Sequence, residues 1–149
     1  MIEAETIITR EAGPGPLADT ITLDQSQRMR RRMAMVSAGG IAFLLTLAQA
    51  VTLRAGDAIV LGDGRLVEVR PKPEEVYAVR GRDTAHLLEL AWHLGNRHLP
   101  TAIFNDRLLI RRDDAIAEIV RGLGGTLDEV EAVFDPAAGA HAGATGDVR

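Results

Sequence analysis

The stretch DTAHLLELAWHLGNRHLP, from Asp83 to Pro100, decides how the second half of the chain folds. It predicts a helix that begins after Asp83, because an N-cap carboxylate can accept a backbone N–H group of the first turn. Aliphatic residues recur in it at helical spacing, and Leu88 and Trp92 widen the apolar stripe. The stripe itself consists of Leu87, Leu90, Ala91 and Leu94. The stretch therefore predicts an amphipathic helix that packs on a core.

The polar end of the same stretch predicts where the helix stops. Gly95 and Asn96 tolerate the left-handed backbone conformation that commonly ends a helix. Pro100 prevents the helix from resuming, because proline lacks the N–H group that a helix interior needs. We therefore expect His98 to project from the helix exit rather than to pack inside the domain.

Three of the four histidines of the chain lie in this stretch. His86, Glu89 and His93 fall at positions i, i+3 and i+7, so they should share the solvated face opposite the apolar stripe. The two histidines would lie about 10 Å apart along the helix axis, too far to chelate one ion together. We therefore interpret both as residues with a packing or hydrogen-bonding role and not as metal ligands.

Turn signals and prolines divide the chain into parts. In the first half, short apolar runs alternate with turns such as Gly39-Gly40 and Asp63-Gly64, which predicts a small all-β domain. Pro71 and Pro73 break this pattern, and the elements after them follow the order βαββαβ of a ferredoxin-like domain. The prediction is an α+β chain with a β domain over residues 1–70, a linker over 71–73, a ferredoxin-like domain over 74–136 and a flexible tail over 137–149.

The composition excludes several classes of protein. Of the 149 residues, 46% are hydrophobic, which is enough to bury a core. The chain has no cysteine, which excludes disulfides, iron–sulfur clusters and thiolate metal sites. The net charge of −4 argues against binding to nucleic acid or to an anionic membrane. Its longest apolar run is far shorter than the ~20 residues that span a bilayer, and its start shows no secretory signal, so we expect a cytoplasmic protein.

The segment Gly95-Asn96-Arg97-His98, behind an apolar helix and in front of Pro100, resembles the signature of the UreE family, the nickel chaperones among the urease accessory proteins. In that family the segment follows the first helix of the C-terminal domain, and its histidine is the principal nickel ligand. The resemblance implies a homodimer formed through this domain, in which two copies of His98 hold one Ni(II) ion at the twofold axis. Because neutral imidazole also suits zinc and copper, Zn(II) and Cu(II) can compete for such a site.

The fourth histidine, His141, lies in the Gly/Ala-rich end of the chain, AAGAHAGATGDVR. Many members of the UreE family end in a His-rich tail that adds metal-binding capacity, whereas this end holds one histidine. The resemblance therefore implies roughly one nickel site per dimer rather than a storage array. His141 is either a ligand that completes this site or an inert residue, and the sequence leaves both roles open.

A cluster of arginines stands out in the first half. It alternates with methionines, a period-two pattern that predicts a strand with one charged and one apolar face. We interpret the charged face as solvated or partner-facing, since the N-terminal domain of UreE proteins is thought to engage partner proteins. The arginines are Arg28, Arg30, Arg31 and Arg32, and the methionines are Met29, Met33 and Met35.

The resemblance implies a metallochaperone that delivers Ni(II) to urease during maturation, together with the accessory GTPase and the urease apoprotein complex. The residues offer no nucleophile elbow, GxGxxG or Walker sequence, so we do not expect an enzyme.

Two other functions stay open. The βαββαβ order is also that of RRM domains, which bind RNA by stacking bases on aromatic side chains, and Tyr77, Phe104 and Phe134 are the candidates here. The other function is a structural adaptor of the urease maturation complex.

Overall fold

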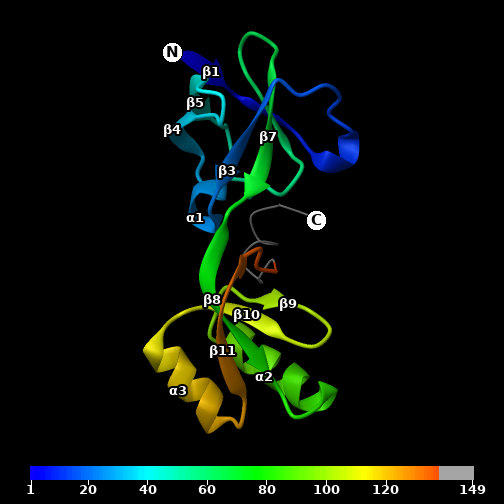
Figure 1. The fold of residues 1–149 in the computed structure, drawn as a ribbon, viewed down its shortest axis with the longest axis vertical. Coiled ribbons are helices and arrows are strands. Elements are labelled where there is room, and N and C mark those ends of the chain that lie inside the picture. Colours follow the sequence, from blue (N-terminus) through cyan, green and yellow to red (C-terminus); the bar gives the residue numbers. More distant parts are fainter. Residues whose placement is uncertain (138–149) are drawn as a thin grey trace. The chain divides into compact units, whose positions relative to one another are not determined.

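A computed structural model describes residues 1–137 of the chain. The chain divides into two compact units, Met1–Lys72 and Pro73–Arg149, each with its own hydrophobic core. Figure 1 shows that the first unit consists mainly of strands, with short helical turns between them. The second unit consists of a sheet and two longer helices. The predicted α+β class, with a β-rich N-terminal part followed by a ferredoxin-like part, is confirmed.

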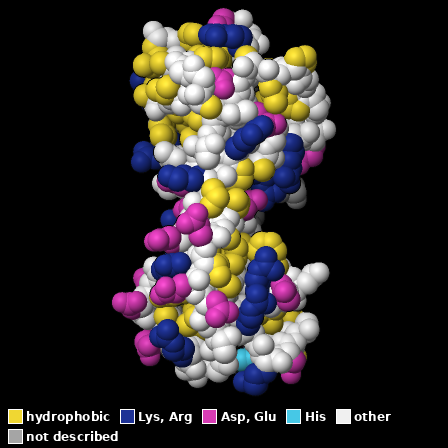
Figure 2. All heavy atoms as spheres, in the orientation of Figure 1, with side chains coloured by type: hydrophobic (Ala, Val, Ile, Leu, Met, Phe, Trp, Pro, Cys, Tyr) yellow, Lys and Arg dark blue, Asp and Glu magenta, His cyan; other side chains and the backbone are white. Residues whose placement is uncertain are grey.

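Seven short strands form two sheets in the first unit. A short 3₁₀ helix, η1 (Arg10–Ala12), follows the second strand. One sheet has the order β1 (Ile2–Ala4), β5 (Ala42–Thr46), β4 (Arg32–Val36), and the other has the order β2 (Thr6–Ile8), β6 (Ala58–Val60), β7 (Leu66–Pro71), β3 (Asp19–Leu23). Residues of both sheets form one apolar core, which includes Leu23, Phe43, Leu45, Leu53, Ile59 and Val67. On the face that Figure 2 shows, basic and acidic side chains are interspersed, so neither sign of charge dominates it.

We expected the arginine–methionine segment to form one strand, because its residue types alternate. The structure shows that it does not. Gln25–Arg28 form a short helix, α1, and β4 begins only at Arg32. Arg28 is fully buried and Met29 is 50% exposed, the reverse of the predicted faces. The cause is Asp24, which builds a capping box with the glutamine three residues after it and so starts a helical turn.

The second unit holds a four-stranded antiparallel sheet with two helices. Its strand order is β11-β8-β10-β9, the order expected when a βαββαβ chain forms a ferredoxin-like sheet. The elements are β8 (Pro73–Arg80), α2 (Thr84–Asn96), β9 (Ala102–Ile103), β10 (Leu108–Arg111), α3 (Asp114–Gly122) and β11 (Thr126–Val133). β7 ends at Pro71 and β8 begins at Pro73, so Lys72 alone separates these two strands.

Both helices pack on one face of this sheet. Leu87, Leu90 and Leu94 of α2 and Val120 of α3 are buried against strand residues such as Ile110. An aspartate sets the start of each helix. The Asp83 carboxylate accepts the N–H group of the residue three positions on, as predicted, and Asp113 does the same for α3. No helix within residues 1–137 is long and apolar enough to cross a membrane.

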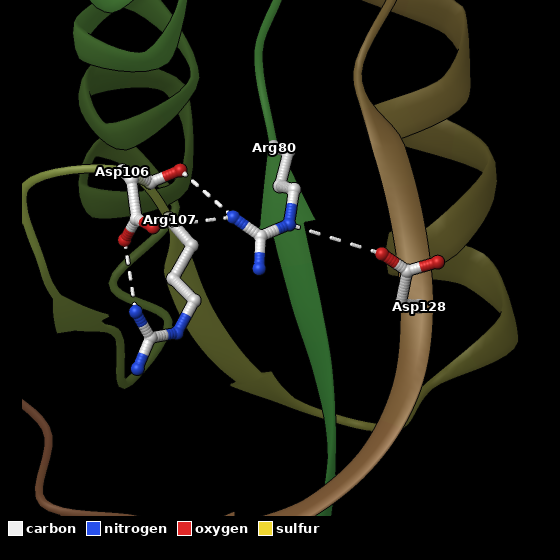
Figure 3. Close-up of polar contacts among 4 residues, drawn as sticks. All are labelled: Arg80, Asp106, Arg107 and Asp128. Carbon is white, nitrogen blue, oxygen red and sulfur yellow. Dashed lines mark hydrogen bonds and ion pairs between the residues drawn. The ribbon is translucent and has the colours of Figure 1, made fainter.

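A group of ion pairs links the loop of the β9–β10 hairpin to β8 and links β8 to β11. Figure 3 shows Asp106 between two guanidinium groups, at 2.8 Å from Arg107 and 3.4 Å from Arg80, while Arg80 also reaches Asp128 at 3.9 Å. The hydrogen bond from the Arg107 side chain, with a further contribution from Arg80, holds the pKa of Asp106 below its usual value. These side chains are largely exposed to solvent, so each pair contributes little to stability.

Candidate metal site

His98 lies where the backbone turns out of α2. The helix runs through Asn96, Arg97 is its C-cap, and His98 has a φ of 59°, in the left-handed region. We had expected Gly95 and Asn96 to supply this left-handed turn, but both are still helical. His98 is exposed at the helix exit, as the sequence predicted.

Two backbone hydrogen bonds fix this conformation. The N–H group of His98 donates to the carbonyl of Gly95 at 3.0 Å, and the N–H group of Leu99 donates to the carbonyl of Leu94 at 3.2 Å. Together they form a Schellman motif, which glycine usually occupies at the position of His98. Leu99 packs against the core of the second unit and anchors the motif. The backbone of His98 is therefore held firmly, at a cost of about 1 kcal/mol for a residue with a side chain.

The segment after His98 contacts the last residues that the structure describes. Thr101 is buried, and its hydroxyl donates to the carbonyl of Leu99 at 3.0 Å. Its own carbonyl accepts the N–H group of Ala137 at 2.8 Å. Ala137, four positions after the last residue of β11, is thus hydrogen-bonded to the loop that follows His98. His141, the second candidate ligand, lies outside the described residues.

His86 is buried and not solvated, contrary to our expectation. Its Nδ1 atom accepts the N–H group of Arg82 at 2.9 Å, so Nε2 carries the proton and donates to the carbonyl of Leu123 at 2.8 Å. The imidazole therefore joins the start of α2 to the end of α3. Both nitrogens are occupied, so His86 has a structural role, in agreement with our interpretation that it is not a metal ligand.

The exposed side of α2 is more apolar than predicted. Leu88 and Trp92, which we expected to widen the core stripe, are each 64% exposed. They stand at i and i+4, so they form one apolar strip on the helix surface. His93 is half-buried and makes an edge contact with the Trp92 ring at 5.1 Å between centroids, while Glu89 is exposed as predicted.

The width of the apolar pattern on α2 could have revealed this strip in the sequence. Leu87, Leu90 and Leu94 already fill the helix face that packs on the sheet. Leu88 and Trp92 lie on a neighbouring face of the helix, which points away from the sheet.

Within residues 1–137, no group of three or more His, Asp or Glu side chains is placed to hold a metal ion.

Comparison with known proteins decides the family. The model for the UreE urease accessory protein N-terminal domain matches residues 4–72, and the model for the C-terminal domain matches residues 74–149. The chain belongs to the UreE urease accessory protein family. The members of this family are named urease accessory proteins, which agrees with our expectation that the chain is not an enzyme.

Relatives named urease accessory protein UreE support this assignment. The chain is 55% identical to the one from Rhodopseudomonas palustris (strain HaA2), over 95% of this chain and 66% of the relative. It is 54% identical to the one from Chelativorans sp. (strain BNC1), over 83% and 78%, and 42% identical to the one from Beijerinckia indica, over 99% and 85%. The chain thus spans slightly less than two thirds of the first relative and more of the other two.

Proposed function

We propose that this UreE chain is a cytoplasmic metallochaperone that binds one Ni(II) ion per homodimer and delivers it to urease during maturation. The observation that carries the proposal is the exposed imidazole of His98, held on a strained but hydrogen-bonded helix end. Strained residues cluster at functional sites, where the cost is offset by the surrounding structure. One imidazole from each of two protomers leaves open positions on the metal, which suits a protein that must release its cargo.

The apolar strip on α2 supports the homodimer. Leu88 and Trp92 expose large apolar surfaces, and tryptophan is enriched among the residues that dominate interface energetics. Ile103, 58% exposed, pairs in register with Leu108, which faces the helices, so Ile103 lies on the same side of the sheet as α2. A twofold contact through this side sets each strip against its own copy.

We extend the proposal to His141 as an additional ligand. Ala137 is hydrogen-bonded to Thr101, three residues after His98. His141 lies four positions after Ala137 in the sequence, and an extended chain of that length spans at most about 14 Å. This short connection to the loop that follows His98 supports a ligand role for His141.

We further propose that residues 1–70 bind partner proteins, among them the accessory GTPase and the urease apoprotein complex. Arg30, Arg31 and Arg32 are exposed at the start of β4 and offer a basic surface for this purpose. Arginine is enriched at protein interfaces, and charged surfaces steer a partner towards its binding site. Delivery then combines a metal-binding unit with a partner-binding unit.

The aromatic residues do not favour the RNA-binding alternative. Tyr77 is 8% exposed and Phe134 is fully buried, so neither offers a face on which a base could stack. Phe104 is exposed, but the Arg107 guanidinium covers its ring at 4.4 Å from the centroid. The structural-adaptor alternative predicts partner binding that does not depend on nickel.

Isothermal titration of Ni(II) into three proteins tests the proposal. His98→Ala should weaken binding by at least about 10-fold, the loss typical even of residues that only support a ligand. The control is His93→Ala, which removes a half-buried histidine of the same helix and should leave the affinity within about twofold of wild type. Wild-type affinity in the His98 variant would contradict the proposal, and the same titrations with Zn(II) and Cu(II) measure how strongly these ions compete.

A further inference from the structure

A groove of about 880 Å³ lies open on the surface of the first unit, between β1 and the turn that joins β6 to β7. Two of its aliphatic lining residues, Leu44 and Val60, are half-buried and so present apolar surface to the groove, and we call them its floor. Ile2, which also lines the groove, packs against the core, and Leu61 is buried. Figure 2 shows hydrophobic side chains gathered on the part of the first unit where Figure 1 places β1 and β5.

The walls of the groove are fixed by backbone hydrogen bonds. The N–H group of Gly62 donates to the carbonyl of Glu3 at 2.7 Å, which holds the β6–β7 turn against β1. A Cβ atom at Gly62 would lie 3.0 Å from that carbonyl oxygen, so glycine permits this close approach. The groove is therefore preformed, and a ligand does not pay to order it.

The rim of the groove is acidic. Glu3, Glu5 and Asp63 line it, and Asp63 pairs with Arg65 at 2.8 Å. Glu3 and Glu5 are exposed, and neither forms an ion pair or side-chain hydrogen bond with any residue in the described part of the chain. Two uncompensated negative charges thus stand beside an apolar floor.

We infer that this groove binds an extended segment of a partner protein in which Lys or Arg residues flank a large aliphatic side chain. The aliphatic side chain covers the floor, and the cations pair with Glu3 and Glu5. The inference deepens the partner-binding role proposed for residues 1–70 and rests on it, but it needs neither His98 nor nickel. Because the contact is small and charged, it should be transient and should weaken with salt.

Fluorescence anisotropy with a labelled peptide tests the inference. The probe is Gly-Lys-Leu-Arg-Leu-Lys-Gly, and the control peptide has glutamate at the three cationic positions. The wild-type protein should bind the probe with a Kd below about 100 μM and should not bind the control peptide. The double variant Glu3→Gln/Glu5→Gln should bind the probe at least about fivefold more weakly. Glu11→Gln/Glu68→Gln, which removes two carboxylates of the same unit outside the groove, should bind like wild type.

Two further readouts keep the test decisive. Amide NMR shifts on adding the probe should centre on Leu44, Val60 and Gly62, and nickel affinity should be the same in the Glu3→Gln/Glu5→Gln variant as in wild type. No binding at about 1 mM probe, equal binding of the acidic peptide, or shifts centred elsewhere would overturn the inference. Self-association of the wild type that the double variant abolishes would overturn it too, because the occupant would then be a second copy. The His98→Ala variant should lose nickel binding but should still bind the probe like wild type, so failure of the nickel proposal can be told apart from failure of this inference.

Discussion

His98 combines an unusual backbone conformation with the side chain that we propose as the nickel ligand. It occupies the left-handed position of a Schellman motif, where glycine would cost less. Histidine is one of the few residues with a side chain that visit this region with some frequency. The imidazole is thereby displayed from a backbone that two hydrogen bonds hold in place, which reduces the entropy lost when it binds a metal.

Substitutions at His98 should separate stability from metal binding. We predict that His98→Gly is more stable than His98→Ala by about 1 kcal/mol, because alanine keeps the cost of a Cβ atom at positive φ. Both variants should lose nickel binding. Urea unfolding measures the first quantity and isothermal titration the second. Equal stabilities of the two variants would show that the backbone at this position is not left-handed in solution.

His86 should matter for folding and not for nickel. Replacing it with alanine removes the partner of the Arg82 N–H group and of the Leu123 carbonyl, in a partly buried place. We predict a loss of about 2–3 kcal/mol in the free energy of unfolding, measured with urea, and an unchanged nickel affinity for the folded protein. His93→Ala, whose side chain is half-buried, should cost less than about 1 kcal/mol. A nickel defect in folded His86→Ala would contradict the structural role.

At the scale of elements, the sequence predicts the starts of helices better than their ends and faces. Asp83 was predicted to be the N-cap of α2 and acts as one, and Asp113 caps α3 in the same way. The end of α2 was misplaced, because Gly95 has intrinsic freedom whereas the conformation of His98 depends on the anchoring of Leu99 in the core. Such tertiary anchoring has no local signal in the chain.

The exposed strip of α2 should hold two copies together. We predict that Leu88→Ser/Trp92→Ser shifts the protein from dimer to monomer and raises the dimer dissociation constant at least about 10-fold, because interface tryptophans are frequent hot spots. Sedimentation velocity measures the shift. Glu89→Ser, at an exposed position between the two apolar residues, is the matched control and should remain dimeric. A dimer unaffected by the double change would move the interface elsewhere.

Asp19 braces the turn between β4 and β5. Its Oδ2 atom accepts hydrogen bonds from the Ser37 hydroxyl at 2.6 Å and from the N–H group of Gly39 at 2.8 Å. The Ser37 hydroxyl above all, with the N–H group of Thr20 next, holds the pKa of Asp19 below its usual value.

A lowered carboxyl pKa makes the contribution of Asp19 to stability depend on pH. The contribution is complete above the usual aspartate pKa of about 4 and is lost as the pH falls through the lower value of the folded state. We therefore predict that the difference in unfolding free energy between wild type and Asp19→Asn is largest near neutral pH and shrinks at acidic pH. Urea titrations of both proteins across this range measure it. A difference that grows on acidification would have the wrong sign.

At the scale of the whole molecule, the order of elements could be predicted because turns, caps and periodicities are local. The path of the first unit between β3 and β4 could not, because the capping box at Asp24 and the burial of Arg28 override the alternation that suggested a strand. Of the candidate site, the sequence offered His98 and His141 through a family signature. The sequence did not show that the strip on α2 is exposed. Nor did it show that Ala137 is hydrogen-bonded to the loop after His98.

The two units carry proposed roles that can be tested separately. The second unit holds His98 and the apolar strip, while the first holds the basic start of β4 and the acid-rimmed groove. Partner binding and metal binding should therefore respond to different substitutions. A protein with both features can approach urease through one unit and offer its cargo through the other.

Native mass spectrometry of the nickel-loaded chain tests the central claim most directly, since it counts metal ions and protomers in one measurement. At equimolar nickel and dimer, the account predicts a dimer that carries one Ni(II) ion. It predicts a metal-free dimer for His98→Asn, whose asparagine accepts the left-handed backbone but does not replace the imidazole. Nickel bound to the monomer, or retained by the His98→Asn dimer, would contradict the account.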